Sequence, residues 1–80
     1  MPELSHSAAK SLRELSEGQR RRAMEIIRRL DHNPALGKKL QGHLRGYRSA
    51  RLGRSHRIIY RVSPDVIRVT AITPRKDAYR

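Results

Sequence analysis

Residues 47–73 read YRSARLGRSHRIIYRVSPDVIRVTAIT. Apolar residues alternate with arginine and serine along much of this stretch, which is the two-residue period of a half-buried strand. The pattern predicts three strands, at 47–52, 56–62 and 66–73, with Pro74 ending the last of them. Because the turns between them are only three residues long, consecutive strands should lie antiparallel and form a meander.

The alternation also assigns the strand residues to two faces. One face is apolar and should pack in the core; it carries Ala50, Leu52, Ile58, Tyr60, Val62, Ile67, Val69 and Ala71. The opposite face collects four arginines, Arg51, Arg57, Arg61 and Arg68. Such a face can bind an anion, but any solvated sheet face also favours long polar side chains. The pattern alone leaves these two interpretations equally open.

Two helices are predicted before the strands. The first should be capped by Ser7 and carry Ala8, Ala9, Leu12 and Leu15 at helical spacing. The second should begin at Ser16, because Ser16 and Gln19 have the spacing of a capping box. Its apolar stripe is Ala23, Met24, Ile26, Ile27 and Leu30. Asp31-His32-Asn33-Pro34 should end it, since the residue before a proline avoids the helical region.

Helices followed by strands predict an α+β fold, with an N-terminal helical hairpin packed on a small antiparallel β-sheet. Eighty residues are enough for one domain, 1–80, and no more. Only Glu3-Leu4-Ser5 could supply a strand before the first helix, so that strand should be short or truncated. Residues 35–46, rich in glycine and lysine, are expected to form a loop.

Charge is the strongest signal in the composition. Nineteen Lys and Arg residues oppose seven Asp and Glu residues, which gives a formal net charge of +12. In a folded chain these positive charges repel one another and lower its stability. Such an imbalance therefore indicates a polyanionic partner: nucleic acid, an acidic protein or an anionic membrane surface. Arginine outnumbers lysine, and its planar guanidinium binds phosphate through two parallel hydrogen bonds.

Several classes of site are disfavoured by what the sequence lacks. It has no cysteine, and no apolar run approaches the ~20 residues of a membrane span. The N-terminus does not read as a signal peptide, so a cytoplasmic location is expected. The four histidines lack metal-ligand spacing, and the few carboxylates are scattered. We therefore expect no metal, no cofactor and no membrane partner.

Four pieces of the sequence, in this order, resemble the RelE/ParE superfamily of toxins from bacterial toxin–antitoxin systems. They are Leu40-Gln41-Gly42, the segment 46–52, the segment 56–62 and Arg75-Lys76-Asp77-Ala78-Tyr79. The Gly-Tyr-x-Ser-x-Arg and His-Arg-Ile-Ile-Tyr pieces are most similar to the YoeB-like branch. Together with the helices, the resemblance covers nearly the whole chain.

The resemblance implies a fold similar to small microbial ribonucleases and a metal-independent endoribonuclease that cuts mRNA, usually on the ribosome. In that reaction the 2′-hydroxyl attacks the adjacent phosphate and the 5′-oxygen leaves. Matched by position, the catalytic residues would be Arg51, Arg57, which holds the scissile phosphate, Arg75, and Tyr79, which orients or stacks a nucleotide. Further RNA contacts are expected from Arg48, Arg61, Arg68, Lys76, Lys38 and Lys39. The expected partners are mRNA, the ribosome and a cognate acidic antitoxin.

The chain departs from the YoeB-like pattern at two positions. The glutamate that acts as general base before the Gly-Tyr piece is missing, and Lys38, Lys39 and His43 occur in that region instead. Thr73-Pro74-Arg75-Lys76 replaces the terminal histidine. Two other functions therefore stay open: a ParE-type inhibitor of DNA gyrase that binds without catalysis, and a degenerate member that only forms a complex. Arg75 and Tyr79 favour the ribonuclease, because a pure binder would not need them.

Overall fold

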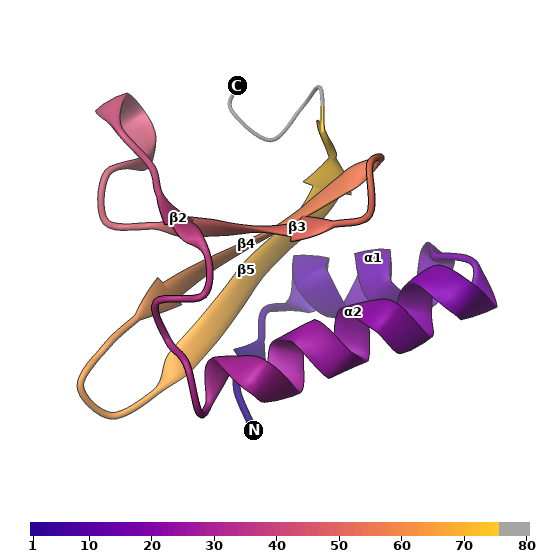
Figure 1. The fold of residues 1–80 in the computed structure, drawn as a ribbon, viewed down its shortest axis with the longest axis horizontal. Coiled ribbons are helices and arrows are strands. Elements are labelled where there is room, and N and C mark those ends of the chain that lie inside the picture. The colour runs from indigo at the N-terminus through magenta and orange to yellow at the C-terminus, as the bar shows by residue number, and fades with distance from the viewer. Residues whose placement is uncertain (76–80) are drawn as a thin grey trace.

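Two helices cover one face of a five-stranded sheet in the computed structural model, which describes residues 1–75 (Figure 1). The elements in chain order are β1 (Glu3–Leu4), α1 (His6–Glu14), α2 (Glu17–Leu30), β2 (Lys38–Lys39), a short 3-10 helix (Gly42–Leu44), β3 (Arg48–Leu52), β4 (His56–Val62) and β5 (Ile67–Pro74). The α+β class and the three strands expected between residues 47 and 73 are confirmed, with bounds that differ by at most one residue.

The strand order in the sheet is β1-β5-β4-β3-β2. β3, β4 and β5 form the expected antiparallel meander, and β2 adds to β3 in antiparallel orientation. β1 is short, as expected, but it pairs with β5 in parallel, so the sheet is mixed where an antiparallel one was expected. β2 lies inside the predicted 35–46 loop; a two-residue strand is too short to produce a periodic signal.

The cap of α1 differs from the prediction. Ser5, not Ser7, is the N-cap: its hydroxyl oxygen accepts a hydrogen bond from the backbone N–H of Ala8 at 3.0 Å. The Ser5 hydroxyl also donates to the carbonyl oxygen of Thr70 at 2.9 Å. The Ser5 side chain therefore caps the helix and also bonds it to β5. A local sequence pattern does not reveal this second bond, because it depends on tertiary structure.

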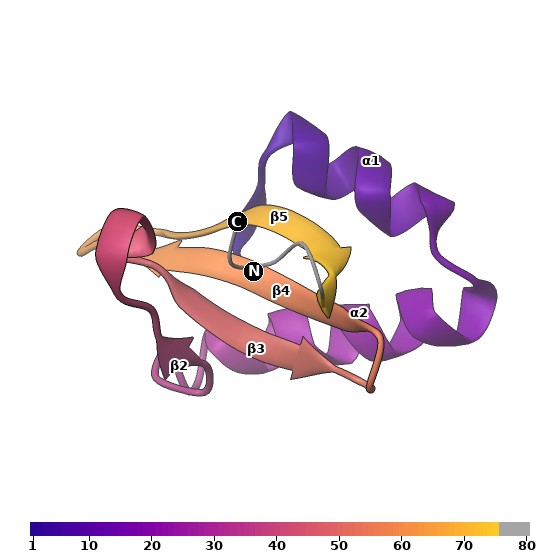
Figure 2. The ribbon, with the colours of Figure 1, turned by 90° about the horizontal axis from the view of Figure 1, so that it is seen from above.

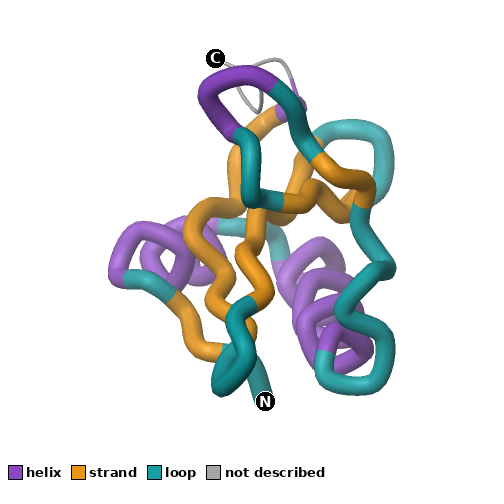
Figure 3. Tube along the Cα trace, turned by 90° about the vertical axis from the view of Figure 1, so that its left-hand side faces the viewer, coloured by secondary structure: helices purple, strands orange, loops and turns teal. Residues whose placement is uncertain are grey.

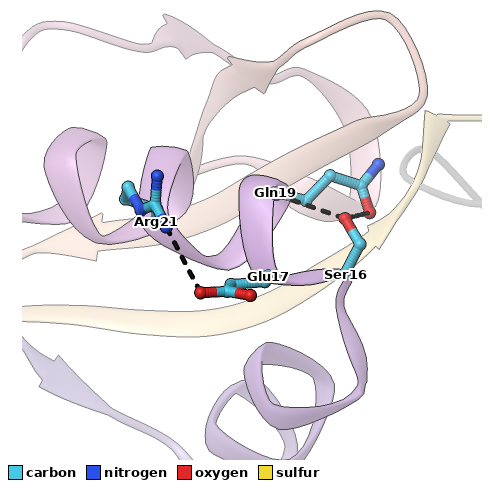
Figure 4. A network of polar contacts seen from close by, with 4 residues as sticks. All are labelled: Ser16, Glu17, Gln19 and Arg21. Atoms are coloured by element: carbon cyan, nitrogen blue, oxygen red, sulfur yellow. Dashed lines mark hydrogen bonds and ion pairs between the residues drawn. The ribbon is translucent and has the colours of Figure 1, made fainter.

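The predicted cap of α2 is confirmed. Ser16 is the N-cap, and its hydroxyl oxygen accepts from the backbone N–H of Gln19 at 3.2 Å and donates to the Gln19 side-chain oxygen at the same distance (Figure 4). At the start of the helix, Glu17 and Arg21 form an exposed ion pair of 3.3 Å. The capping box thus fixes where α2 begins, immediately after the chain leaves α1.

The helices run antiparallel and diverge from their junction at residues 15–16 (Figures 2 and 3). α1 packs against β5 and α2 against β3, so the helix pair spans the width of the meander. One core cluster joins both helices to the sheet; it contains Ala8, Leu15, Ala23, Ile27, Leu30, Ala50, Leu52, Ile58, Tyr60, Val69 and Ile72. The apolar stripe predicted for α2 accordingly faces the core.

A bulge in β5 changes the predicted faces of that strand. Ile59 pairs with Ala71 and Tyr60 with Val69, which leaves Thr70 without a partner residue in β4. The Thr70 hydroxyl donates to the Ile59 carbonyl at 3.2 Å. The extra residue reverses the alternation beyond it, so Ala71 lies on the face away from the helices and Ile72 lies in the core. The predicted core position of Ala71 was wrong.

The face away from the helices carries a small apolar cluster of its own. Leu40 and Ile59 are buried there, and Leu44, Tyr47 and Ala71 pack against them. Val62, predicted to be core, is instead 43% exposed at the end of β4. The second apolar cluster therefore lies on the same face as the four arginines predicted from the alternation.

Tyr60 holds the segment 34–39 against the sheet. Its hydroxyl is buried, donates to the carbonyl of Pro34 at 2.8 Å and accepts from the backbone N–H of Gly37 at 2.7 Å. Burial raises the pKa of the Tyr60 hydroxyl, so it stays protonated and able to donate. The guanidinium of Arg48 donates to the carbonyl of Gly37 at 2.8 Å. Both polar groups of Gly37 are thus bonded.

Gly37→Ala should destabilise the protein, because an added Cβ would lie 2.8 Å from the Tyr60 ring and hydroxyl and 2.9 Å from the backbone of Ser49. We expect a loss of about 1–3 kcal/mol, the usual cost of overpacking, which corresponds to about 4–8 °C of melting temperature per kcal/mol. Gly18→Ala is the control, since no atom lies within 4 Å of its Cβ position and alanine favours a helix. Thermal melting that gave both variants the same stability would contradict the account of the Tyr60 contacts.

Candidate nucleic-acid interface

A groove of about 590 Å³ runs along the open edge of β3, between α2 and the segment 36–38. β2 pairs only with Arg48 and Ser49, so the rest of this edge has no strand beside it among the described residues. The residues that line the groove are Arg22, Glu25, Ile26, Arg29, Leu36, Lys38, Ser49, Ala50, Arg51 and Arg57. Five of these are basic and one is acidic. The groove therefore attracts anions.

Arg57 is the most unusual residue in the groove. It is only 8% exposed, and it lies directly opposite Arg51 in the β3–β4 pair. No carboxylate within residues 1–75 forms an ion pair with it, and its guanidinium makes only a long hydrogen bond, 3.4 Å, to the neighbouring carbonyl of His56. A buried cation without a counter-ion is costly unless an anion neutralises it.

Two buried hydroxyls near Arg57 also lack partners within the described part of the chain. They belong to Ser49 and Thr73. Thr73 is the cross-strand partner of Arg57 in β5, and Ser49 lies two residues before Arg51 in β3. Directly paired and diagonal neighbours on one face are close enough for side chains to meet. Buried polar atoms are nearly always bonded, so these two hydroxyls are available to donate to a group bound beside Arg57.

The four arginines expected on one face are separated into two pairs. Arg51 and Arg57 oppose each other near one end of β4, and Arg61 and Arg68 oppose each other near the other end. Ile59 and the apolar cluster around it lie between the pairs. Arg68 forms an exposed ion pair with Glu3 at 3.3 Å. The four arginines thus share one face, as expected, but they lie there as two separate pairs.

The remaining predicted site residues lie in different places. Lys38 lines the groove with Arg51 and Arg57. Lys39 and Arg48 line a second hollow of about 370 Å³ at the other end of β3. Arg75 is exposed just beyond β5, where its backbone N–H donates to the carbonyl of Ser55 at 2.7 Å. Lys76 and Tyr79 lie outside the described residues, so the structure does not show how they relate to the groove.

The sequence prediction missed the contribution of α2 to the groove. Arg22, Glu25, Ile26 and Arg29 fall on one stripe of the helix, beside the stripe that faces the core. Their spacing was visible in the sequence, but it did not show that this stripe borders β3. Ser49 was missed because nothing in the sequence distinguishes it from an ordinary serine of a strand.

Other kinds of site find no support in the part of the chain that the structure describes. No three His, Asp or Glu side chains within residues 1–75 gather closely enough to hold a metal ion. None of the described helices is sufficiently long and apolar to cross a membrane.

Solved structures of similar fold cover nearly the whole chain. The RelE–RelB complex from the archaeon Pyrococcus horikoshii OT3 is 29% identical, covers 95% of this chain and 94% of that chain, and has a TM-score of 0.78. A YoeB/ParE toxin from Agrobacterium tumefaciens is 24% identical, covers 94% and 99%, and has a TM-score of 0.81. A YoeB–YefM complex from Staphylococcus aureus is 23% identical, covers 91% and 93%, and has a TM-score of 0.79.

The sequence also matches a family model, described as ParE toxin of type II toxin-antitoxin system, parDE, over residues 3–79. No curated protein matches it. Since the family match and the similar structures both span nearly the entire chain, the resemblance seen in the sequence is confirmed. The chain belongs to the ParE toxin family, within the RelE/ParE superfamily of type II toxin–antitoxin systems.

Proposed function

We propose that this toxin is a metal-independent endoribonuclease that cleaves mRNA on the ribosome and is inhibited by an acidic antitoxin. The observation that carries the proposal is Arg57, buried without a carboxylate partner among the described residues in a groove with four other basic residues. A phosphate of the RNA backbone would neutralise this cation. The resemblance to the family favours the same residue as the groove does, since Arg57 matches the arginine that holds the scissile phosphate in the family pattern.

The proposed chemistry needs charge stabilisation above all. The 2′-hydroxyl attacks the adjacent phosphorus, the bond to the 5′-oxygen breaks, and the negative charge on the phosphoryl oxygens increases in the transition state. Guanidinium groups already in position stabilise such a charge without having to reorganise. Arg57 would bind the phosphoryl oxygens, and Arg51, directly opposite in β3, would assist. The unpaired hydroxyl of Ser49, in the same groove, is a further donor.

We assign the role of proton acceptor to Glu25. The glutamate that the YoeB-like pattern has before the Gly-Tyr piece is missing, and Glu25 of α2 is the one carboxylate among the described residues that line the groove. A carboxylate can accept the proton of the 2′-hydroxyl as that oxygen attacks. In this assignment α2 supplies the base, and β3 and β4 supply the phosphate-binding arginines.

The other predicted site residues have supporting roles in the proposal. Lys38, in the groove, and Arg75, at the end of β5, would bind neighbouring phosphates. Tyr79 would stack on a nucleotide, as the resemblance implies. Lys39, Arg48, Arg61, Arg68 and Lys76 would make RNA contacts outside the reacting centre.

The family match supports a second candidate function, because the matching model is that of a ParE toxin. In that case the basic surface would bind DNA gyrase without any chemistry. The two functions predict different activities of the purified protein: cleavage of mRNA by the first, and inhibition of gyrase supercoiling without RNA cleavage by the second. The unpaired Arg57 favours the ribonuclease, since a phosphate group of bound RNA would neutralise a cation that is buried in the groove.

Arg57→Met should abolish mRNA cleavage while leaving the protein folded. Removing one donor to a developing oxyanion costs about 10²–10³ in rate. Methionine keeps much of the side-chain volume and removes an unpaired buried charge, so we expect the melting temperature at low salt to stay equal or rise. Cleavage would be measured on translated mRNA with purified ribosomes.

The control for this variant is Arg13→Met, which removes an exposed charge at the end of α1. It should cleave at the normal rate. Undiminished cleavage by Arg57→Met, or an equal loss in both variants, would refute the assignment of Arg57. If the unaltered toxin inhibited supercoiling by gyrase and cut no mRNA, the gyrase function would replace the proposed one.

Glu25→Gln should change RNA binding and cleavage in opposite directions. Removing the negative charge from a basic groove strengthens attraction to phosphate, so binding should tighten slightly at low salt. Loss of the proton acceptor should slow cleavage by about 10²–10⁴. The matched control is Glu14→Gln, at the exposed end of α1, which should alter neither. A Glu25→Gln variant that cleaves normally would show that another group accepts the proton.

An acidic antitoxin should stabilise the toxin strongly. Binding to the native state alone raises its stability by about 4 kcal/mol at a thousandfold excess over the dissociation constant. It would also relieve the self-repulsion of a chain with a net charge of +12. The test is thermal melting of the toxin with and without the product of the adjacent gene. If the melting temperature did not change and size-exclusion chromatography showed no complex, that protein would not be the antitoxin.

A further inference from the structure

The second hollow, at the end of β3 opposite the groove, has no role in the proposed reaction. Its volume is about 370 Å³. Its walls include three basic residues, Lys39, Arg45 and Arg48, and three apolar or aromatic ones, Leu40, Tyr47 and Val62. No acidic residue is among its lining residues, all of which belong to the described part of the chain. Cations that converge in this way repel one another unless an anion lies between them.

The hollow also presents an aromatic ring. Tyr47 is half-buried and packs against Leu40 and Ile59, so its ring is fixed in place. The guanidinium of Arg61 lies over this ring, 5.7 Å from its centre. Aromatic rings and guanidinium planes are the surfaces on which unpaired RNA bases stack, and neighbouring cations then bind the phosphates. The hollow combines both requirements.

Backbone hydrogen bonds make the wall of this hollow firm. The N–H of Leu40 donates to the carbonyl of Tyr47 at 3.0 Å, and the N–H of Tyr47 donates to the carbonyl of Leu44 at 3.1 Å. Gly46 has a φ of +96°, a conformation that favours glycine and turns the chain between Arg45 and Tyr47. The backbone on either side of the Tyr47 ring is thus held in place before a ligand binds.

We propose that this hollow binds one nucleotide of a single-stranded RNA whose phosphate backbone also occupies the groove at Arg57. The base contacts Tyr47 and Arg61, and the phosphate contacts Arg45 and Lys39. Tyr47, the residue before β3, and Arg51, within β3, are four residues apart, a distance of about 13 Å along an extended chain. A strand of a few nucleotides therefore spans both sites. The inference rests on the proposed RNA substrate and adds a second point of contact to it.

RNA explains the hollow better than an acidic peptide does. Carboxylates would satisfy Lys39 and Arg45 but give no reason for an immobilised ring with a guanidinium over it. A nucleotide uses both the ring and the charges. The volume is also at the low end of the ~300–1,000 Å³ typical of small-ligand sites. An acidic peptide remains a distinct outcome of the experiment.

The test compares short and long oligonucleotides. Oligonucleotides of 2′-O-methyl RNA bind but have no free 2′-hydroxyl to attack, so affinities can be measured by fluorescence anisotropy without cleavage. The shorter oligonucleotide has about two nucleotides and is too short to occupy both sites, and the longer one has about ten, within the range that small single-strand-binding domains cover. The longer one should bind the unaltered toxin at least about tenfold more tightly, because only it reaches from the groove to the hollow.

Tyr47→Ala and Arg45→Ala should each lower the affinity for the longer oligonucleotide by about tenfold, and leave the affinity for the shorter one unchanged. Tyr47→Phe keeps the ring and should retain most of the advantage. Arg13→Ala removes one exposed charge from α1 and should preserve the difference between the two lengths.

Three results would overturn the inference. The first is that the unaltered toxin binds both lengths equally well, and the second is that Arg45→Ala loses affinity equally for both lengths. The third is that Arg45→Ala loses affinity for polyglutamate, the probe for an acidic peptide, but keeps its affinity for RNA. The last result would assign the hollow to an acidic protein. Failure of the proposed function would be seen separately, as absence of mRNA cleavage by a toxin that still shows the length advantage.

Discussion

A single buried hydroxyl determines where the segment after α2 lies. Tyr60 reaches from β4 through the core to Pro34 and Gly37, and both of its hydrogen bonds are made to backbone groups. A buried phenol without partners would cost several kcal/mol, so the loop must supply these groups. The segment held in this way carries Leu36 and Lys38 to the groove and leads directly to Lys39 and Leu40 at the second hollow. Both basic hollows therefore depend on one contact.

Most of the layout could be predicted from the sequence, because it follows from local pattern. The alternation from residue 47 onward indicated the meander, and Ser16 with Gln19 indicated the start of α2. What could not be predicted depends on contacts distant in the chain. The bulge at Thr70 adds one residue that no period reveals, and Ser5 is the cap because it also bonds to β5. The short β2 exists only because β3 is beside it.

The candidate site, too, could be predicted from the sequence only in part. A polyanionic partner could be predicted from the charge, and the arginines of β3 and β4 could be named, with Ile59 between them. That Arg57 is buried and that α2 contributes Arg22, Glu25 and Arg29 could not be predicted, because each depends on how helix and sheet pack. Such a groove weakens a small domain through repulsion among its cations, and functional sites commonly carry a cost of this kind.

The apolar cluster between the two arginine pairs has a consequence for turnover. Leu40 and Ile59 pack with Tyr47 in this cluster, and the groove and the second hollow lie at different places along β3, so an RNA strand that reaches both is a bivalent ligand. Bivalent attachment can exceed either single affinity by a factor of about 10²–10⁴ without any new contact. Cutting the strand at Arg57 divides it into two pieces, each held at one point. Under the two proposals, the reaction itself would therefore remove the avidity that held the substrate, and product would leave without a conformational change in the toxin.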